Sequence, residues 1–221
     1  TVTTTTQAES IGDVLERSQR KRLDELSQPA TDATRAARVR ASFERLLVAL
    51  DVRTKVELRV VAAPVIAETL LGRVVIANQA LADVSEGERL FVLAHELAHT
   101  MHGHWDQLGS LYKRHIPGEV KQEQTDAVAG ARGREASAQA HDHELQADAF
   151  ALRALERLNY GVDEAMAAFL RNGVQHDTAT HPGTRKLFVL MLLRPPRSTR
   201  YMTLFPCTSL FRSRAARAAT R

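Results

Sequence analysis

Residues 85–105 read SEGERLFVLAHELAHTMHGHW, and this stretch decides which fold the chain can adopt. Ser85 followed three residues later by Glu88 predicts a capping box, in which each side chain bonds the backbone of the other at a helix start. Apolar residues surround the following turns on nearly every side, which is typical of a buried helix. We therefore expect a central buried helix that ends near Gly103 or Trp105.

The same helix contains His95-Glu96-Leu97-Ala98-His99, an HExxH pattern. Residues four apart on a helix share a face, so His95 and His99 can bind one metal ion together. Two buried imidazoles without partners would each cost about 1–3 kcal/mol, and a shared ion satisfies both. Glu96 then lies beside the open coordination position. A zinc-bound water has its pKa lowered towards about 7, so this carboxylate can take its proton as a general base.

A third ligand is needed, and the only cysteine, Cys207, leaves His and carboxylates as the candidates. The metzincin pattern fails because His102 stands where glycine is required and Trp105 where histidine is required. Downstream, a strongly helical segment begins with HELQAD at 143–148 and offers Glu144 as the third ligand. Asp148, one turn later, can accept the free ring N–H of a ligand histidine. The alternative is that Glu144 and Asp148 are two surface acids on a helix. If Glu144 is the third ligand, the chain binds one Zn²⁺.

Three motifs in order carry a resemblance: HELAH at 95–99, ELQAD at 144–148 and THPGTRK at 180–186. Together with the Asn-containing segment that leads into the HExxH helix, they resemble the HtpX-like and CAAX-prenyl-protease-like zinc peptidases, a group of gluzincins. The similarity covers about residues 36–190. It implies an endopeptidase acting on a protein or peptide substrate. It also implies that His181 lies near the metal, as a transition-state donor or an occluding extra ligand, and that Arg185 supports the site.

Many members of that family have transmembrane helices, whereas the apolar runs of this chain, such as Leu187–Leu193, are far shorter than the roughly 20 residues that cross a bilayer. We therefore expect no transmembrane segment in this chain, which as given would be soluble. The compartment, cytoplasmic or periplasmic, stays open, as do the oligomeric state and whether an N-terminal signal or anchor precedes residue 1.

The charge of the chain is unevenly distributed. The net charge is +4, but residues 194–221 contain seven Arg and no acid, which leaves 23 bases against 26 acids in residues 1–193. We expect three regions: a disordered or short helical lead-in at 1–30, a zinc metallopeptidase domain at 31–193, and an Arg-rich tail at 194–221 that is disordered or a sequence artefact. A nucleic-acid binder acting through the tail is a rival hypothesis, but no specific nucleic-acid partner is expected.

The periodicity of the domain predicts an α+β fold, mainly helical, with a small sheet and a central HExxH helix, and the family resemblance implies that this fold is zincin-like. Alternating β-branched residues predict two paired strands at 56–62 and 72–77 joined by an irregular connection. The edge near 74–77 is expected to hold extended substrate by strand addition. Helical patterns cover the segments 9–26, 32–51, 143–158 and 163–170, with a further short helix after Pro182 and a polar excursion at 113–142.

The remaining histidines are interpreted as solvated residues rather than as a second metal site; they are His102, His104, His115, His141, His143 and His176. Two other functions remain as alternatives. An ImmA-like regulatory peptidase that cleaves a repressor also has HExxH and a downstream acid, although the HP-Arg segment argues against it. The second alternative is a zinc-bound scaffold or chaperone-like protein without catalysis. Glu96 argues against it, because a structural zinc site needs no general base.

Overall fold

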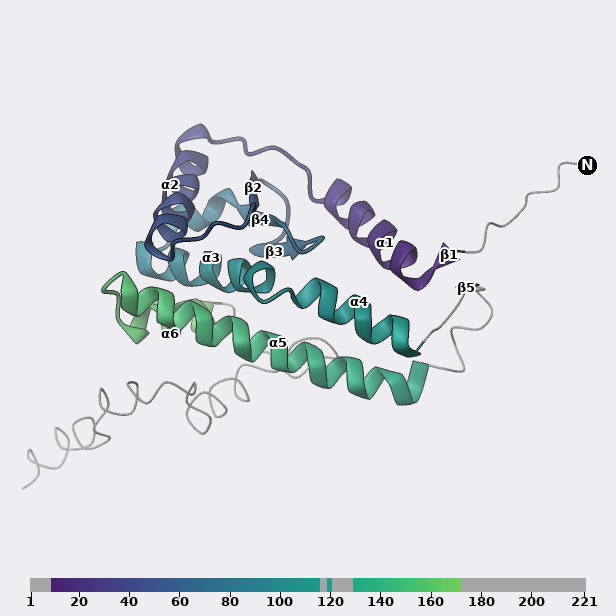
Figure 1. Cartoon of the computed structure of the whole chain (residues 1–221). Coiled ribbons are helices and arrows are strands. Elements are labelled where there is room, and N and C mark those ends of the chain that lie inside the picture. Colours follow the sequence, from purple (N-terminus) through teal and green to yellow (C-terminus); the bar gives the residue numbers. More distant parts are fainter. Residues whose placement is uncertain (1–8, 116–118, 121–128, 172–221) are drawn as a thin grey trace, which may run out of the picture.

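A computed structural model describes residues 9–115 and 135–171, together with the backbone of 119–120 and 129–134 (Figure 1). Several sequence predictions lie outside these residues: His176, His181, Arg185, the helix after Pro182 and the tail from 194. The described elements, in chain order, are β1 (Glu9–Ser10), α1 (Ile11–Glu25), α2 (Ala33–Ala49), β2 (Glu57–Val61), β3 (Ala67–Leu70), β4 (Val74–Asn78), the 3₁₀ turn η1 (Gln79–Asp83), α3 (Glu86–Met101), α4 (His104–His115), β5 (Glu119–Val120), α5 (Ala129–Arg157) and α6 (Val162–Arg171).

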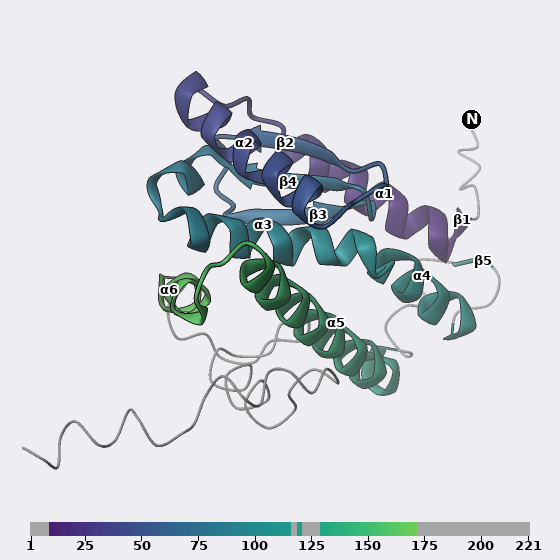
Figure 2. The same cartoon turned by 60° about the vertical axis from the view of Figure 1, so that its left-hand side comes forward.

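The fold is α+β and mainly helical, as predicted, with a three-stranded sheet ordered β2-β4-β3. Helix α3 lies between this sheet and α5 (Figure 2). The central strand β4 is buried on both faces. Val75 and Ala77 join the core with α2, α3, α5 and α6, whereas Val74 and Ile76 pack with Leu23 of α1 on the opposite face. The HExxH helix is therefore central to the molecule.

The sheet corrects two predictions. Strands β2 and β4 pair in parallel, but their connection is not irregular, because it contains β3, which pairs antiparallel with β4. Strand β4 consequently has neighbours on both sides and no free edge, so substrate cannot add to the sheet at 74–77. The described strand that forms the edge next to α3 is β3.

The start of α3 shows half of the predicted capping box. The Ser85 hydroxyl accepts a hydrogen bond from the Glu88 backbone N–H at 3.1 Å. The Glu88 carboxylate, however, accepts bonds from the Arg171 guanidinium of α6, at 2.5 and 3.0 Å, instead of bonding the Ser85 backbone. A buried carboxylate is stabilised more by a bidentate arginine than by one backbone N–H. Asp32, by contrast, caps α2 as predicted, accepting from the Arg35 N–H.

Helix α3 ends at Met101, and Gly103 follows with φ of +64°. This left-handed conformation favours glycine and ends the helix. The sequence pattern predicted that this helix ends near Gly103 or Trp105, close to the observed end of α3. It did not predict the second helix, α4, which begins at once with His104 and continues to His115. Among the described helices, none has the length and apolarity needed to span a bilayer.

Gly72 offers a test of the turn between β3 and β4. Its φ is +64°, and an added Cβ would lie 2.9 Å from the Trp105 Cβ. Gly72→Ala is therefore expected to lower the free energy of unfolding by about 2 kcal/mol, from backbone strain and steric conflict together. Gly109→Ala is the control, because nothing lies within 4 Å of its added Cβ in α4. There alanine should raise stability by about 0.5–1 kcal/mol. Urea denaturation of both variants measures the difference, and equal stability of the two would contradict the expectation.

Candidate metal centre

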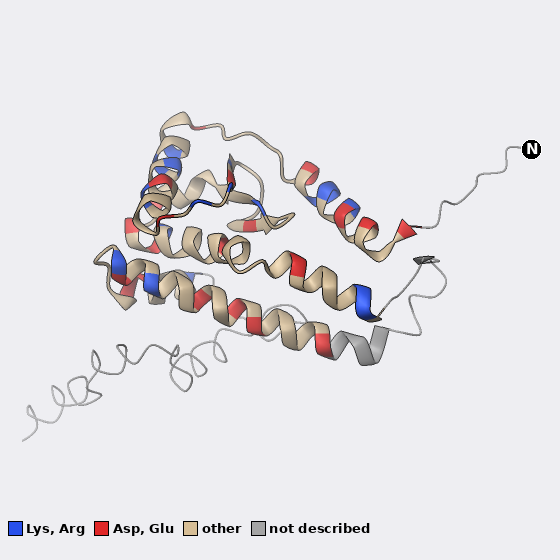
Figure 3. Ribbon diagram, in the orientation of Figure 1, with Lys and Arg blue, Asp and Glu red and all other residues tan. Residues whose placement is uncertain are grey.

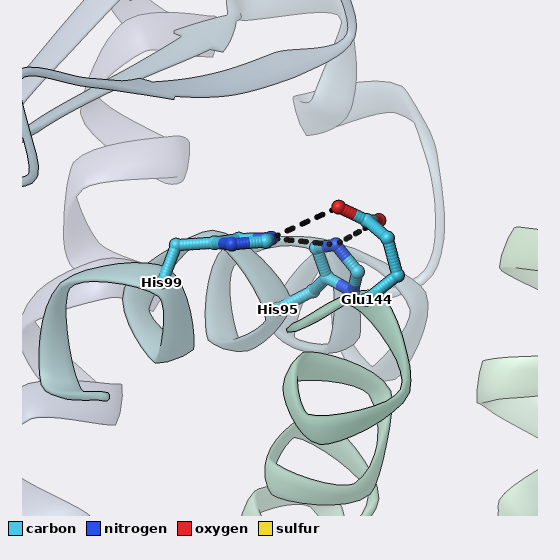
Figure 4. Close-up of side chains that lie close together, drawn as sticks. All are labelled: His95, His99 and Glu144. Atoms are coloured by element: carbon cyan, nitrogen blue, oxygen red, sulfur yellow. Dashed lines mark hydrogen bonds and ion pairs between the residues drawn. The ribbon is translucent and has the colours of Figure 1, made fainter. Parts of the chain in front are cut away.

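Two helices that are far apart in the sequence bring three ligand-type side chains together. His95 and His99 project from α3 and Glu144 from α5 (Figure 4). The His95 and His99 Nε2 atoms are 3.3 Å apart. The Glu144 carboxylate oxygens lie 3.3 Å from the His95 Nε2 and 3.6 Å from the His99 Nε2. These three side chains are 14–19% exposed, so the group opens to solvent while its flanks are covered by protein.

The spacing fits a tetrahedral metal site. Zinc lies about 2.0–2.2 Å from nitrogen and oxygen ligands, so tetrahedral ligand atoms are about 3.3–3.6 Å from one another. The Nε2–Nε2 separation of 3.3 Å matches this range, as do the distances of 3.3 Å from the His95 Nε2 to the Glu144 Oε2 and of 3.6 Å from the His99 Nε2 to the Glu144 Oε1. The donor set of two imidazoles and one carboxylate is also that of a catalytic zinc site, which keeps a fourth position open.

Asp148, one turn after Glu144, holds the first histidine. Its Oδ1 lies 2.8 Å from the His95 Nδ1, and the carboxyl is almost fully buried. An acceptor-only carboxylate keeps the proton on Nδ1, which leaves Nε2 free to face the other ligand atoms. Burial alone would lower the pKa of His95, but the hydrogen bonds to Asp148 and Glu144 outweigh burial and raise that pKa well above 6.5.

The second histidine has a partner that the sequence did not reveal. The His99 Nδ1 lies 2.9 Å from the His104 Nδ1. Only 4% of His104 and 6% of His143 is exposed, so the prediction that both are solvated is wrong. Burial lowers the pKa of His99 to about 3 and the pKa of His104 to about 4, and neighbouring histidines add to both shifts. Both rings are therefore neutral at neutral pH, as a metal ligand must be.

Glu96 lies next to the ligand group and is held from the sheet. The Thr69 hydroxyl, on the edge strand β3, is 2.7 Å from the Glu96 Oε2 and 2.8 Å from its backbone oxygen. Burial raises the pKa of Glu96, and the proximity of His95 and the bond to Thr69 oppose that shift. A carboxylate with a raised pKa is better matched to taking a proton near neutral pH.

The charge around the group favours a cation. From Glu135 to Leu152, α5 carries four acids and no Lys or Arg, and the arginines at 153 and 157 follow only towards its C-terminal end (Figure 3). Two of these acids, Glu144 and Asp148, belong to the site itself. This acidic stretch of α5, which faces the two histidines of α3, attracts a divalent ion.

The sequence predicted a site of His95, Glu96, His99, Glu144 and Asp148, and the structure places these five side chains near one another. It missed Thr69 and His104. Thr69 carries no local signal, because its contact depends on how β3 packs against α3. His104 had one signal: Gly103 marks a helix break between it and His99.

Comparison with known proteins gives one finding. The sequence model of peptidase family M48 matches residues 33–116, from the start of α2 to the end of α4, which includes HExxH but not Glu144. The part of the chain that contains HExxH is therefore similar to metal-dependent peptidases of that family. Searches of the curated proteins and of the solved structures give no match.

Proposed function

We propose that this chain is a zinc-dependent endopeptidase of the M48 family, of the HtpX-like kind, with His95, His99 and Glu144 holding the ion. The convergence of three ligand atoms carries this proposal. With Nδ1 of each ring engaged, the two Nε2 atoms and the Glu144 carboxylate face one another at 3.3–3.6 Å. Without a metal, the proton of His95, whose pKa is raised, lies between these electron-rich atoms, and a divalent cation can take its place. The M48 match favours this function over the repressor-cleaving alternative.

Zinc bound there supplies a Lewis acid and a water of lowered pKa. The residues of the chain supply the rest. Glu96 takes the proton of the attacking water and later gives it to the leaving amine, the role of a general base and acid. Asp148 fixes the orientation of His95, and Thr69 fixes that of the Glu96 carboxylate. His181 as a donor or occluding ligand and Arg185 as a supporting residue are part of the proposal, by family resemblance.

The substrate peptide is proposed to bind along β3 instead of β4. Among the described strands, β3 pairs with β4 alone, and Thr69 on β3 touches the proposed base. An extended peptide added to this free edge would place a carbonyl near the metal, because strand addition aligns the backbone of the peptide with the strand. The domain boundaries at 31 and 193 remain predictions.

Zinc content and chelator sensitivity test the proposal. Purified full chain should contain one zinc per molecule by mass spectrometry of the metal. Hydrolysis of casein or of quenched fluorescent peptides should stop on removal of zinc by a chelator and return when zinc is added. Folded protein that neither retains nor takes up zinc would refute the proposal.

Thr69→Val tests how the base is held. Valine has the shape of threonine without the hydroxyl, so the variant should lower kcat/KM about 10-fold and leave the zinc content unchanged. The expected loss corresponds to about 1.4 kcal/mol, within the range for removing one partner of a buried polar group. Thr69→Ser keeps the hydroxyl and serves as the control. Valine with wild-type kinetics would show that this bond does not orient Glu96 in the reaction.

A further inference from the structure

His104 contacts the proposed ligand His99 at Nδ1, the ring nitrogen that does not face the other proposed ligands. His104 also belongs to a longer chain of hydrogen bonds. Its Nδ1 is 2.9 Å from the His99 Nδ1, and its Nε2 is 3.3 Å from the Gln146 Oε1. The Gln146 amide nitrogen donates in turn to the Asp142 Oδ2 at 2.7 Å. This chain runs from α4 across to α5 and ends on an exposed carboxylate.

The helix break at Gly103 makes this contact possible. On a continuous helix, residues five apart lie about 140° apart around the axis and do not face each other. Because α3 ends at Met101 and α4 begins at His104, the His104 ring can return towards His99. Stacking on His143 also holds the His104 ring in place, with 4.0 Å between the ring centroids and 4° between the ring planes. His143 is itself held by Gln107, whose Oε1 lies 3.0 Å from its Nε2.

The positions of the protons follow from the acceptor at the end of the chain. A carboxylate only accepts, so Asp142 orients Gln146 with its NH₂ towards Asp142 and its oxygen towards His104. That oxygen also only accepts, so the His104 Nε2 carries the proton and, in the neutral ring, its Nδ1 is bare. The bare nitrogen must then accept from the His99 Nδ1–H. His99 is left with a lone pair on Nε2, the atom that faces His95 and Glu144.

We propose that Asp142, Gln146 and His104 form a relay that sets the tautomer and orientation of His99, as Asp148 does directly for His95. His104 is thus a positioning residue for the metal site. The inference rests on the proposed zinc site and deepens it. Each proposed histidine ligand has its tautomer set by a carboxylate: Asp148 contacts His95 directly, whereas Asp142 acts on His99 through Gln146 and His104. Outer partners of this kind contribute about 10- to 100-fold to metal affinity.

Substitution of His104 tests the relay in the full chain. His104→Leu should weaken zinc binding at least about 10-fold in a chelator competition assay. His104→Asn should stay within about 3-fold of wild type, because its side-chain oxygen can occupy the place of Nδ1 and accept the same bond. His102→Leu is the matched control: it removes a neighbouring histidine that stacks on His104 but makes no described hydrogen bond to a ligand ring. Thermal unfolding checks that each variant is folded.

A second measurement reads the tautomer without any metal. Long-range ¹H–¹⁵N NMR of the zinc-free protein should show His99 protonated on Nδ1 in the wild type and in His104→Asn, with the Nε2–H form appearing in His104→Leu. Wild-type zinc affinity in His104→Leu, or an Nε2–H tautomer of His99 in the wild type, would overturn the relay. A wild type that binds no zinc would instead overturn the proposed function, while the NMR result would still decide the relay.

Discussion

Replacing Glu96 by Gln is expected to lower kcat/KM by about 10²- to 10⁴-fold, while the protein retains one zinc per chain. The range is that of a positioned general acid–base group. Glutamine has nearly the same shape and can still accept the Thr69 hydroxyl bond, but its amide cannot take a proton from water. Steady-state hydrolysis of a fluorescent peptide, with zinc measured on the same sample, separates the loss of the base from a loss of metal.

The control for this variant is Glu156→Gln, which makes the same chemical change at an exposed position of α5. It should have wild-type kinetics. If Glu96→Gln binds zinc and turns over substrate as fast as wild type, Glu96 is not the base. If neither variant nor the wild type hydrolyses any substrate although all bind zinc, the non-catalytic scaffold becomes the better account of the chain.

Glu144→Ala is expected to weaken zinc binding by at least about 100-fold and to abolish hydrolysis at limiting zinc. The loss of a direct ligand should exceed the about 10- to 100-fold cost of losing an outer partner. Glu144 is the one proposed ligand on α5, and its oxygens lie 3.3 and 3.6 Å from the Nε2 atoms of His95 and His99. Zinc affinity by chelator competition and metal content after dialysis measure the effect.

Glu156→Ala removes a carboxylate from the same helix without touching the site, and its zinc affinity should match that of the wild type. The comparison separates ligation by Glu144 from the general effect of removing one negative charge from α5. Equal affinities in Glu144→Ala and wild type would mean that another group completes the site, and the three-ligand assignment would have to be abandoned.

The central part of this fold could be predicted from the sequence because its signals are local. The apolar turns of α3, the cap at Asp32 and the spacing of His95 and His99 each depend on a few neighbouring residues. Glu144 could be found because it begins a helical pattern, and four-residue spacing puts Asp148 on the same face. Helix period thus predicts the members of the site and their grouping, although not the distances between them.

The remainder depends on contacts between distant segments. Strand β3 has only four residues of mixed polarity, AETL, and is stabilised by its pairing with β4, so no period marks it. Without β3 the free edge of the sheet was placed on the wrong strand. His104 was predicted to be solvated because residues at a helix end usually are. In the structure the helix break at Gly103 turns the chain and α5 covers His104, so the residue is buried.

The division of the ligands between α3 and α5 has a consequence for how long the folded protein persists. An ion bound by both helices would act as a cross-link between segments about 45 residues apart, present only in the folded chain. By mass action, free zinc at 100 times its dissociation constant would add about 2.7 kcal/mol to the free energy of unfolding. Zinc supply would then govern resistance to degradation as well as turnover: a cell short of zinc would lose the protein itself in addition to its activity.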